Sequence, residues 1–344
     1  MPYVVVMEYK KPAHSPGFTI VELLIVIVVI GILAAISIVT YSGIQQRAVV
    51  ASLTSDLDNA SKLLKLFQVD NSSYPSTINC ALPDSTTNKC VKSSGSTTYQ
   101  YIAATIPQLF CITATNNSQS YSINQDGTPL AGPCPIFSLN AGNSMSYPGT
   151  GTVWTDLSGN GNSGTLMNGV GYSNANGGAL SFDGVDDRVE VNIQTYGNDM
   201  TWSACFYGTQ SVNAINMFMG RHLPYFGFYG GNSLIFSNLI NSVQRTIYSP
   251  TNLSLNTWYC PSFTTTYDGS NTTMNIYING NFITNGTYPG THTNSSSKFT
   301  VGDGHTPTWY PFKGLVSEVK IQNRALSASE IQQNFNALRG RYGI

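Results

Sequence analysis

The stretch that decides the fold is Gly17-Phe-Thr-Ile-Val-Glu22-Leu-Leu-Ile-Val-Ile-Val-Val-Ile-Gly31-Ile-Leu-Ala-Ala-Ile36. Between Phe18 and Val39, Glu22 is the only charged residue. An α-helix of about 20 apolar residues crosses the hydrocarbon core of a bilayer, and its backbone hydrogen bonds are satisfied internally. The stretch therefore predicts a membrane-spanning helix over about 18–40. The basic pair Lys10-Lys11 before it predicts an N-terminus on the cytoplasmic side.

Glu22 is unusual because an intramembrane carboxylate is costly and normally has a partner. A short basic leader, Gly17, Phe18 and a glutamate at the fifth position after the glycine together resemble the type IV pilin family. The resemblance implies that a prepilin peptidase cuts between Gly17 and Phe18 and that Phe18 becomes N-methylated. It also implies that Glu22 pairs with the new N-terminus of a neighbouring subunit in the fibre. An uncleaved anchor, or a Sec signal cut near Ala34-Ala35, would leave Glu22 unexplained.

Two details of this region remain open from the sequence. Residues 1–17 form a leader in this interpretation, and Met7 is an alternative start that would leave a short basic leader. Members of the family often carry a proline near the end of the apolar run, where this chain has Val39. The helix is therefore expected to be more continuous, with Gly31 as its weak point.

Composition limits the classes of function. The 344 residues leave room for about two domains besides a helix. Only 10% of the residues are charged and the net charge is -1, so there is no basic field of the kind that nucleic-acid binders carry. Six cysteines in a chain that crosses the membrane indicate disulfides rather than metal ligands.

The helical pattern continues beyond the membrane segment. Apolar residues recur at steps of three and four as one stripe, formed by Val49, Leu53, Leu57, Ala60, Leu64 and Phe67. The pattern predicts one long helix over 18–69, whose second half packs on a sheet. Turn-forming residues and Pro75 end it.

Residues 70–134 are predicted to form a small disulfide-stapled β region. The segments 99–102, 110–113 and 121–124 have strand character, and Asp126-Gly127 is a turn signal. A β region this small cannot form a sufficient hydrophobic core, so it needs disulfide bonds and must pack against the helix. Four cysteines allow three pairings, of which we expect the nearest-neighbour one, Cys80–Cys90 and Cys111–Cys134.

Gly132-Pro-Cys-Pro135 is predicted to be a hinge, after which the character of the sequence changes. Residues 135–344 resemble laminin-G-like, concanavalin A-like lectin domains through blocks in the family's order, among them Trp154-Thr-Asp-Leu-Ser-Gly-Asn-Gly-Asn162 and Phe182-Asp-Gly-Val-Asp-Asp187. The fold class expected is thus an α+β pilin, with a long N-terminal helix and a small antiparallel sheet, followed by an all-β jelly-roll sandwich.

Local patterns in 135–344 favour the same sandwich. Val189, Val191 and Ile193 alternate with polar residues, which is typical of a strand buried on one face. Asn279-Gly280 is a two-residue hairpin signal. Ser327 and Glu330 form a capping box before a short C-terminal helix. Cys205 and Cys260 are expected to pair, two buried free thiols being the alternative.

Candidate chemistry in this module is limited. Asp183, Asp186 and Asp187, together with Glu318, offer hard oxygen ligands for a structural Ca²⁺. The alternative is that Asp186 and Asp187 only cap a turn and pair with Arg188. The glutamates show no closely spaced cluster of the glycosidase kind and the histidines are scattered, so we expect no enzyme.

Sugar binding would need aromatic rings for stacking. The candidates are Tyr225, Phe228, Tyr229, Trp309 and Tyr310, although alternating aromatics in a sandwich more often form its core.

The sequence as a whole predicts a type IV pilus subunit, minor rather than major, whose lectin-like module binds glycans or a host-cell surface. Its expected partners are other pilin subunits, a prepilin peptidase and, before assembly, the cytoplasmic membrane; its final location is an extracellular pilus. Two alternatives remain open. One is a pseudopilin of a type II secretion or DNA-uptake system in which the sandwich is a spacer, and the other is a surface glycosidase.

Overall fold

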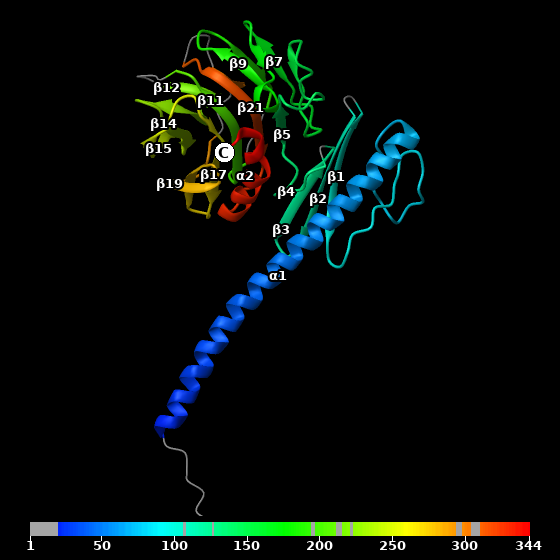
Figure 1. The fold of residues 1–344 in the computed structure, drawn as a ribbon, viewed down its shortest axis with the longest axis vertical. Helices are drawn as coiled ribbons and strands as arrows, with labels where there is room; N and C mark the ends of the chain where they lie inside the picture. The colour runs from blue at the N-terminus through cyan, green and yellow to red at the C-terminus, as the bar shows by residue number, and fades with distance from the viewer. Residues whose placement is uncertain are drawn as a thin grey trace, which may run out of the picture. The chain divides into compact units, whose positions relative to one another are not determined.

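The computed structural model describes residues 20–105, 108–125, 127–193, 197–210, 215–220, 223–293, 298–303 and 310–344. These residues fall into two compact units that divide after Val49 (Figure 1). The leader 1–17 and the predicted cleavage position between Gly17 and Phe18 lie outside the described residues, as do Asp126 of the predicted turn and Trp309.

The first unit is the apolar part of helix α1 (Ile20–Asn71). The helix is continuous, including at Gly31, and its 52 residues correspond to about 78 Å at 1.5 Å per residue. By length and composition α1 can cross a membrane. Its apolar side chains, from Ile20 to Ile38, are exposed around the helix, as expected of a segment that meets lipid or other helices.

The second unit begins with the rest of α1 and a small antiparallel sheet. This sheet has the order β1-β2-β3-β4, with β1 (Thr98–Thr105), β2 (Gln108–Asn116), β3 (Gln119–Asn124) and β4 (Leu130–Ala131). The predicted stripe of α1 is buried from Leu53 to Phe67. Gln68 donates a hydrogen bond to Gln108 at the start of β2, and Tyr74 packs edge-on against Phe110 of the same strand. The helix and the sheet therefore share one small core.

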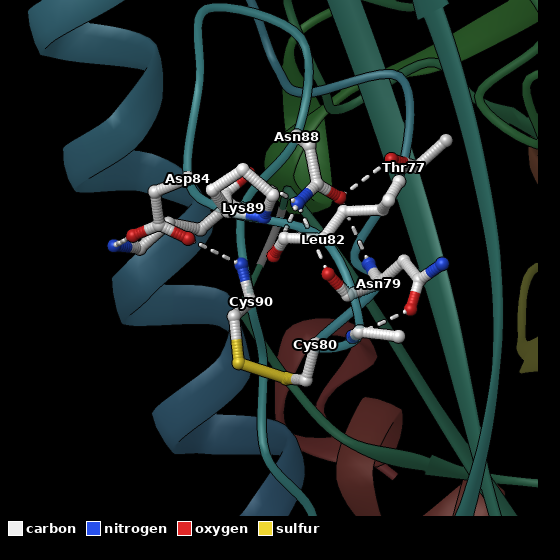
Figure 2. The surroundings of a disulfide bond; sticks show 10 residues. Thr77, Asn79, Cys80, Leu82, Asp84, Asn88, Lys89 and Cys90 are labelled. Carbon is white, nitrogen blue, oxygen red and sulfur yellow. Dashed lines mark hydrogen bonds and ion pairs between the residues drawn. A yellow bond between two sulfur atoms is a disulfide. The ribbon is translucent and has the colours of Figure 1, made fainter.

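A disulfide loop joins α1 to β1 and is held by side chains rather than by regular structure (Figure 2). Cys80 is bonded to Cys90. Asn88, which is buried, donates from Nδ2 to the carbonyls of Asn79 and Pro83 at 3.0 Å each, and its Oδ1 accepts from the backbone of Asn79. Asp84 accepts a hydrogen bond from the backbone of Cys90. One buried amide thus fixes a loop that has little apolar material.

Two antiparallel sheets form the sandwich that follows. The eight-stranded sheet, here the front sheet, has the order β15-β14-β13-β12-β20-β10-β7-β6; the nine-stranded back sheet has β19-β18-β17-β11-β21-β9-β8, with β16 and β5 attached. The front strands are β6 (Val153–Trp154), β7 (Gly164–Met167), β10 (Arg188–Val191), β12 (Ile215–Gly220), β13 (Tyr225–Tyr229), β14 (Ser233–Ile240), β15 (Val243–Asn252) and β20 (Phe299–Val301). The back strands are β5 (Phe137–Asn140), β8 (Gly171–Ser173), β9 (Ala179–Asp183), β11 (Met200–Gly208), β16 (Trp258–Tyr259), β17 (Pro261–Tyr267), β18 (Asn271–Ile278), β19 (Asn281–Pro289) and β21 (Lys313–Gln322).

The core between the sheets is rich in aromatic rings. Trp202 packs against Phe226 and Phe236 with ring centroids 5.5 and 5.8 Å apart, and all three side chains are fully buried. The predicted alternation in β10 is confirmed, since Val189 and Val191 belong to this core. The hairpin signal is confirmed too: Asn279 and Gly280 join β18 to β19 with φ angles of 51° and 79°.

Helix α2 (Ala328–Tyr342) closes the chain on the outer face of the back sheet (Figure 1). The predicted capping box is present, with Ser327 accepting from the backbone of Glu330 and the Glu330 carboxylate accepting from the backbone of Ser327. Tyr342 packs against Trp258 beside the Cys205–Cys260 disulfide. In the described part of the chain, the outer face of the front sheet has no such helix over it.

α2 also contacts the small sheet. Asn334 exchanges two hydrogen bonds with the backbone of Ala131 in β4, and Gln333 accepts one from Tyr121 in β3. Cys134, just after β4, is bonded to Cys111. All three disulfides join the pairs that the sequence predicts. The small sheet and the sandwich therefore belong to one compact unit although a proline-rich segment connects them.

Candidate functional site

The N-terminal helix carries the first candidate. Glu22 lies in the first described turn of α1 and is exposed, flanked by apolar side chains such as Val21 and Leu23. A helix N-terminus attracts negative charge through its dipole, which favours an acid at this place. A neighbouring subunit's amino group is a fitting partner for such a carboxylate, but Gly17 and Phe18 lie outside the described residues, so the processing site stays a prediction.

An acidic turn between β9 and β10 is the second candidate. Asp183, Asp186 and Asp187 present ligand oxygens that all lie within 4.8 Å of one another. The turn is tightened by its own backbone, because Asp183 N–H donates to Asp187 Oδ2 at 2.9 Å and Val185 N–H donates to Asp183 Oδ1 at 2.8 Å. The local sequence thus brings the three carboxylates close together.

Asp187 gives this turn its chemical character. Its side chain is buried, and Oδ1 has no hydrogen-bond partner. Burial, with the nearby charges of Asp183 and Asp186, raises the pKa of Asp187 despite the hydrogen bond that it accepts. Such a site favours a bound cation, which would offset most of the negative charge of the carboxylates and coordinate the free oxygen. The donor set, carboxylate oxygens alone, fits Ca²⁺ rather than a softer metal.

Glu318 does not belong to this cluster, which corrects the sequence prediction. In β21, Lys313 lies opposite Asp183, whereas Glu318 is five residues further along and lies opposite Cys205. At about 3.3 Å per residue the two positions are roughly 16 Å apart. Glu318 instead forms an ion pair with Lys320 on the outer face of the back sheet. The sequence motif identified the acidic turn but could not position a strand from the far end of the module.

Successive side chains of β13 face the core and the outside in turn, and this divides the predicted sugar-binding aromatics of the strand into two groups. Phe228 points into the core, where it packs edge-on against Phe206, and this removes it from the set. Tyr225 lies on the outer face but is buried in a small cluster with Met217, against which Tyr310 packs. Its hydroxyl accepts a hydrogen bond from Gln244. Burial raises the pKa of Tyr225. These two tyrosines support the face rather than present free rings.

Among the predicted aromatics that the structure describes, Tyr229 is the one that is freely presented, with 47% of its side chain exposed. It has a neighbour that the sequence analysis missed: Tyr248 of β15 is 48% exposed, and the two ring centroids are 5.8 Å apart. The alternation of β15 around the buried Ile247 could have identified Tyr248. The pair forms an uncharged aromatic surface on the front sheet of a kind that suits stacking of a sugar ring.

Two glutamates of the module, Glu190 and Glu330, are engaged in ion pairs. Glu190 is held by Arg188 and Lys298, which lie 3.0 and 2.7 Å from its oxygens. The hydrogen bond from Lys298 is the main reason that the pKa of Glu190 is lowered, and Arg188 adds to it. Glu330 is paired with Arg324 at 2.5 Å. A glycosidase needs two carboxylates facing each other across the bond that is cut, and these glutamates instead face basic residues.

Two family profiles match separate parts of the chain. Residues 13–38 match the prokaryotic N-terminal methylation motif, and residues 182–332 match the concanavalin A-like lectin/glucanases superfamily. The recognition of a prepilin-type N-terminus fused to a concanavalin A-like module is therefore confirmed, and so is the expected fold class.

Curated relatives align with the N-terminal helix region. The type IV wide pilus major component PilA4 of Thermus thermophilus is 43% identical over 63 residues, which is 18% of this chain and 48% of that protein. The type II secretion system core protein G of Escherichia coli is 34% identical over 61 residues, covering 18% and 42%. The chain thus spans less than half the length of each of these relatives. A pilus component and a secretion-system protein both align with this chain, so the alignments do not distinguish between the two kinds of machine.

Solved structures resemble the sandwich only loosely. The receptor-binding domain of botulinum neurotoxin type G is 15% identical, with 59% of this chain and 51% of that chain covered and a TM-score of 0.46. Domain 4 of the arabinanase AbnA from Geobacillus stearothermophilus, solved with arabinotriose, is 20% identical, with 58% and 96% covered and a TM-score of 0.45.

Proposed function

We propose that this chain is a subunit of a type IV pilus, and a minor one, whose sandwich is displayed on the filament and binds glycans. The single observation that carries the proposal is a lone glutamate in an apolar helix within a prepilin methylation motif, joined in one chain to a concanavalin A-like module. The helix anchors the subunit in the cytoplasmic membrane until a prepilin peptidase removes the leader. It then packs among the helices of other subunits.

The minor role follows from size. A sandwich of two large sheets has to be accommodated beside every neighbour in a fibre, which favours occasional insertion or a place at the tip. The adhesive role is supported by the open outer face of the front sheet, where Tyr229 and Tyr248 offer exposed rings. Aromatic rings bury the apolar face of a sugar while hydroxyl groups at the edge form hydrogen bonds.

Shear fractionation tests the pilus assignment. Cells that express the tagged chain are sheared, and the filament fraction is separated from the membranes. A pilus subunit is expected in the sheared fraction, and its first residue should be Phe18. A pseudopilin of a secretion or DNA-uptake machine would remain with the membranes, and that result would contradict the proposal.

Glycan binding is tested separately. The full chain, purified in a detergent without a sugar headgroup, is applied to immobilised glycans with calcium and with a chelator. We expect binding that is weakened by the Tyr229→Ala, Tyr248→Ala double variant and unchanged by the matched Phe282→Ala variant, which removes an equally exposed ring from β19 of the back sheet. If no glycan is retained, the spacer role gains support. Release of sugar products would favour a glycosidase.

We further propose that the acidic turn of Asp183, Asp186 and Asp187 holds a structural Ca²⁺. The buried, unpaired Oδ1 of Asp187 supports this assignment. A cation here would fix the connection between β9 of the back sheet and β10 of the front sheet.

A further inference from the structure

We propose that a cleft between the small sheet, α2 and the sandwich is a binding site for one neutral sugar ring, separate from the tyrosines of the front sheet. All of its lining residues belong to the compact unit Val50–Ile344. The cleft has a volume of about 440 Å³, within the roughly 300–1,000 Å³ common for ligand pockets. Its walls come from three places: Thr128 and Leu130 of the small sheet, the 140–144 turn of the sandwich, and Leu338 of α2.

The cleft continues inward. A deeper cavity of about 70 Å³ shares Glu318, Lys320, Leu130 and Leu338 with it. Glu318 and Lys320 therefore lie where the open cleft meets the cavity. Ligand sites prefer such junctions between modules because two surfaces contribute different groups.

Glu318 is the observation that points to a ligand. It is 3% exposed, yet only one of its oxygens is satisfied. Oε1 is paired with Lys320, while Oε2 is buried without a hydrogen-bond partner. A buried carboxylate oxygen without a donor is unfavourable, and functional sites are common places for such groups. A ligand that brings a hydroxyl donor would remove this cost.

The charge and polarity of the other residues that line the cleft indicate which class of ligand fits it. Among the described residues that line the cleft, Glu318 and Lys320 are the charged groups, and they balance each other. Arg341 lies behind the lining residue Asn140 and is engaged by hydrogen bonds to Asn140 and Ser317. An anion or cation would therefore gain little. Amide and hydroxyl side chains, including Asn143, Ser144 and Thr128, line the same space as Leu130 and Leu338. A sugar ring matches this mixture because it has an apolar face and a rim of hydroxyl groups.

The test uses the full chain in a detergent without a sugar headgroup, titrated calorimetrically with free glucose, galactose, mannose and N-acetylglucosamine. We expect at least one to bind. Glu318→Gln should weaken binding by about tenfold, as expected for loss of one charge-assisted hydrogen bond. Ser144→Trp fills the cleft from an exposed position and should abolish binding, whereas Thr287→Trp, exposed on β19, should leave it unchanged. Circular dichroism and thermal unfolding establish that each variant is folded.

The outcomes separate this inference from the proposed function. Binding that survives Ser144→Trp overturns the cleft site, as does the absence of any binding to the four sugars. Binding that is lost only in the Tyr229→Ala, Tyr248→Ala variant places the sugar on the front sheet, which supports the adhesive proposal and overturns this one. If the chain binds these sugars through the cleft but stays with the membranes on shearing, the cleft site stands and the pilus assignment fails.

Discussion

Glu22 is the residue on which the assembly proposal depends. Its neighbours Val21, Leu23 and Leu24 are apolar and exposed, so the helix surface around the carboxylate is one that lipid or other helices would cover. A carboxylate in lipid is tolerated when a positive group pairs with it. In the proposed fibre of processed subunits, we expect that group to be the methylated amine of the next chain.

Replacing this carboxylate should therefore block assembly without affecting insertion. We expect Glu22→Leu to be inserted and cleaved normally but to be absent from the sheared filament fraction. The measurement is the ratio of sheared to membrane-bound chain. Leu24→Ala, two residues further along the helix, serves as the control and should assemble. Normal filament incorporation of Glu22→Leu would disprove the pairing.

Asp187 has an equally specific expectation. Because burial raises the pKa of its carboxyl, the ionised form is disfavoured until a cation binds. A site filled at a hundred times its dissociation constant stabilises a protein by about 2.7 kcal/mol. Calcium should thus raise the melting temperature of the wild-type chain, a chelator should reverse the rise, and Asp187→Asn should show neither effect. The exposed Asp268→Asn variant is the control; equal melting curves with and without calcium would exclude the site.

At the scale of elements, α2 shows how a short helix is fixed by its first turn. Glu330 is 6% exposed and lies at the third helical position, where it bonds the backbone of Ser327 and the guanidinium of Arg324. Burial would raise its pKa, but the hydrogen bonds from Arg324 and Ser327 prevail and lower it. The helix start therefore depends on an ionised carboxylate.

This dependence predicts a pH effect of definite sign. A lowered folded-state pKa means that Glu330 stabilises the fold above the ordinary value of 4.5 and that the stabilisation is lost as the pH falls through the folded-state pKa. Glu330→Gln should lower the free energy of unfolding at pH 7 by on the order of 1 to 2 kcal/mol, and the difference from wild type should shrink as the pH falls below 4.5 and through the folded-state pKa. Hydrogen exchange of the α2 backbone amides is measured in Glu330→Gln and in Glu190→Gln, which serves as the control. Faster exchange in Glu330→Gln alone would locate the loss of stability at α2. A difference that stays the same as the pH is lowered until the protein unfolds would contradict it.

At the scale of the molecule, the sandwich and the small sheet belong to one compact unit, and α2 contacts both of them. Asn334 and Ala131 exchange two hydrogen bonds, and Gln322 of β21 donates one to the carbonyl of Pro133. These bonds bridge the segment that the sequence marks as a hinge. In the proposed adhesive role, force on the sandwich would pass to the helix through these contacts and the Cys111–Cys134 disulfide.

Removing the contacts should uncouple the modules. We expect Asn334→Ala combined with Gln333→Ala to convert a single thermal transition into two, each module keeping its own core. The measurement is calorimetry of the full chain, and Gln332→Ala on the same helix is the control. One unchanged transition would show that the coupling lies elsewhere.

Much of this arrangement could be predicted from local sequence. The long helix, the stripe from Leu53 to Phe67, the hairpin at Asn279-Gly280 and the capping box at Ser327 all depend on neighbours within a few residues, where periodicity and turn chemistry act directly. The acidic turn was found for the same reason, because its three aspartates are adjacent in the chain.

Only the tertiary structure decided what depends on strands far apart in the sequence. Whether an aromatic residue faces the core or the outside is set by the register of its strand, which placed Phe228 inside and paired Tyr229 with Tyr248. The prediction that Glu318 is a ligand at the acidic turn is wrong, because the position of Glu318 is set by the register of β21 against β11 and β9. The sequence alone does not show this register. The local sequence therefore determined where the helices, strands and turns form. The tertiary structure decided which side chains meet, because each is buried by residues that are far away in the sequence.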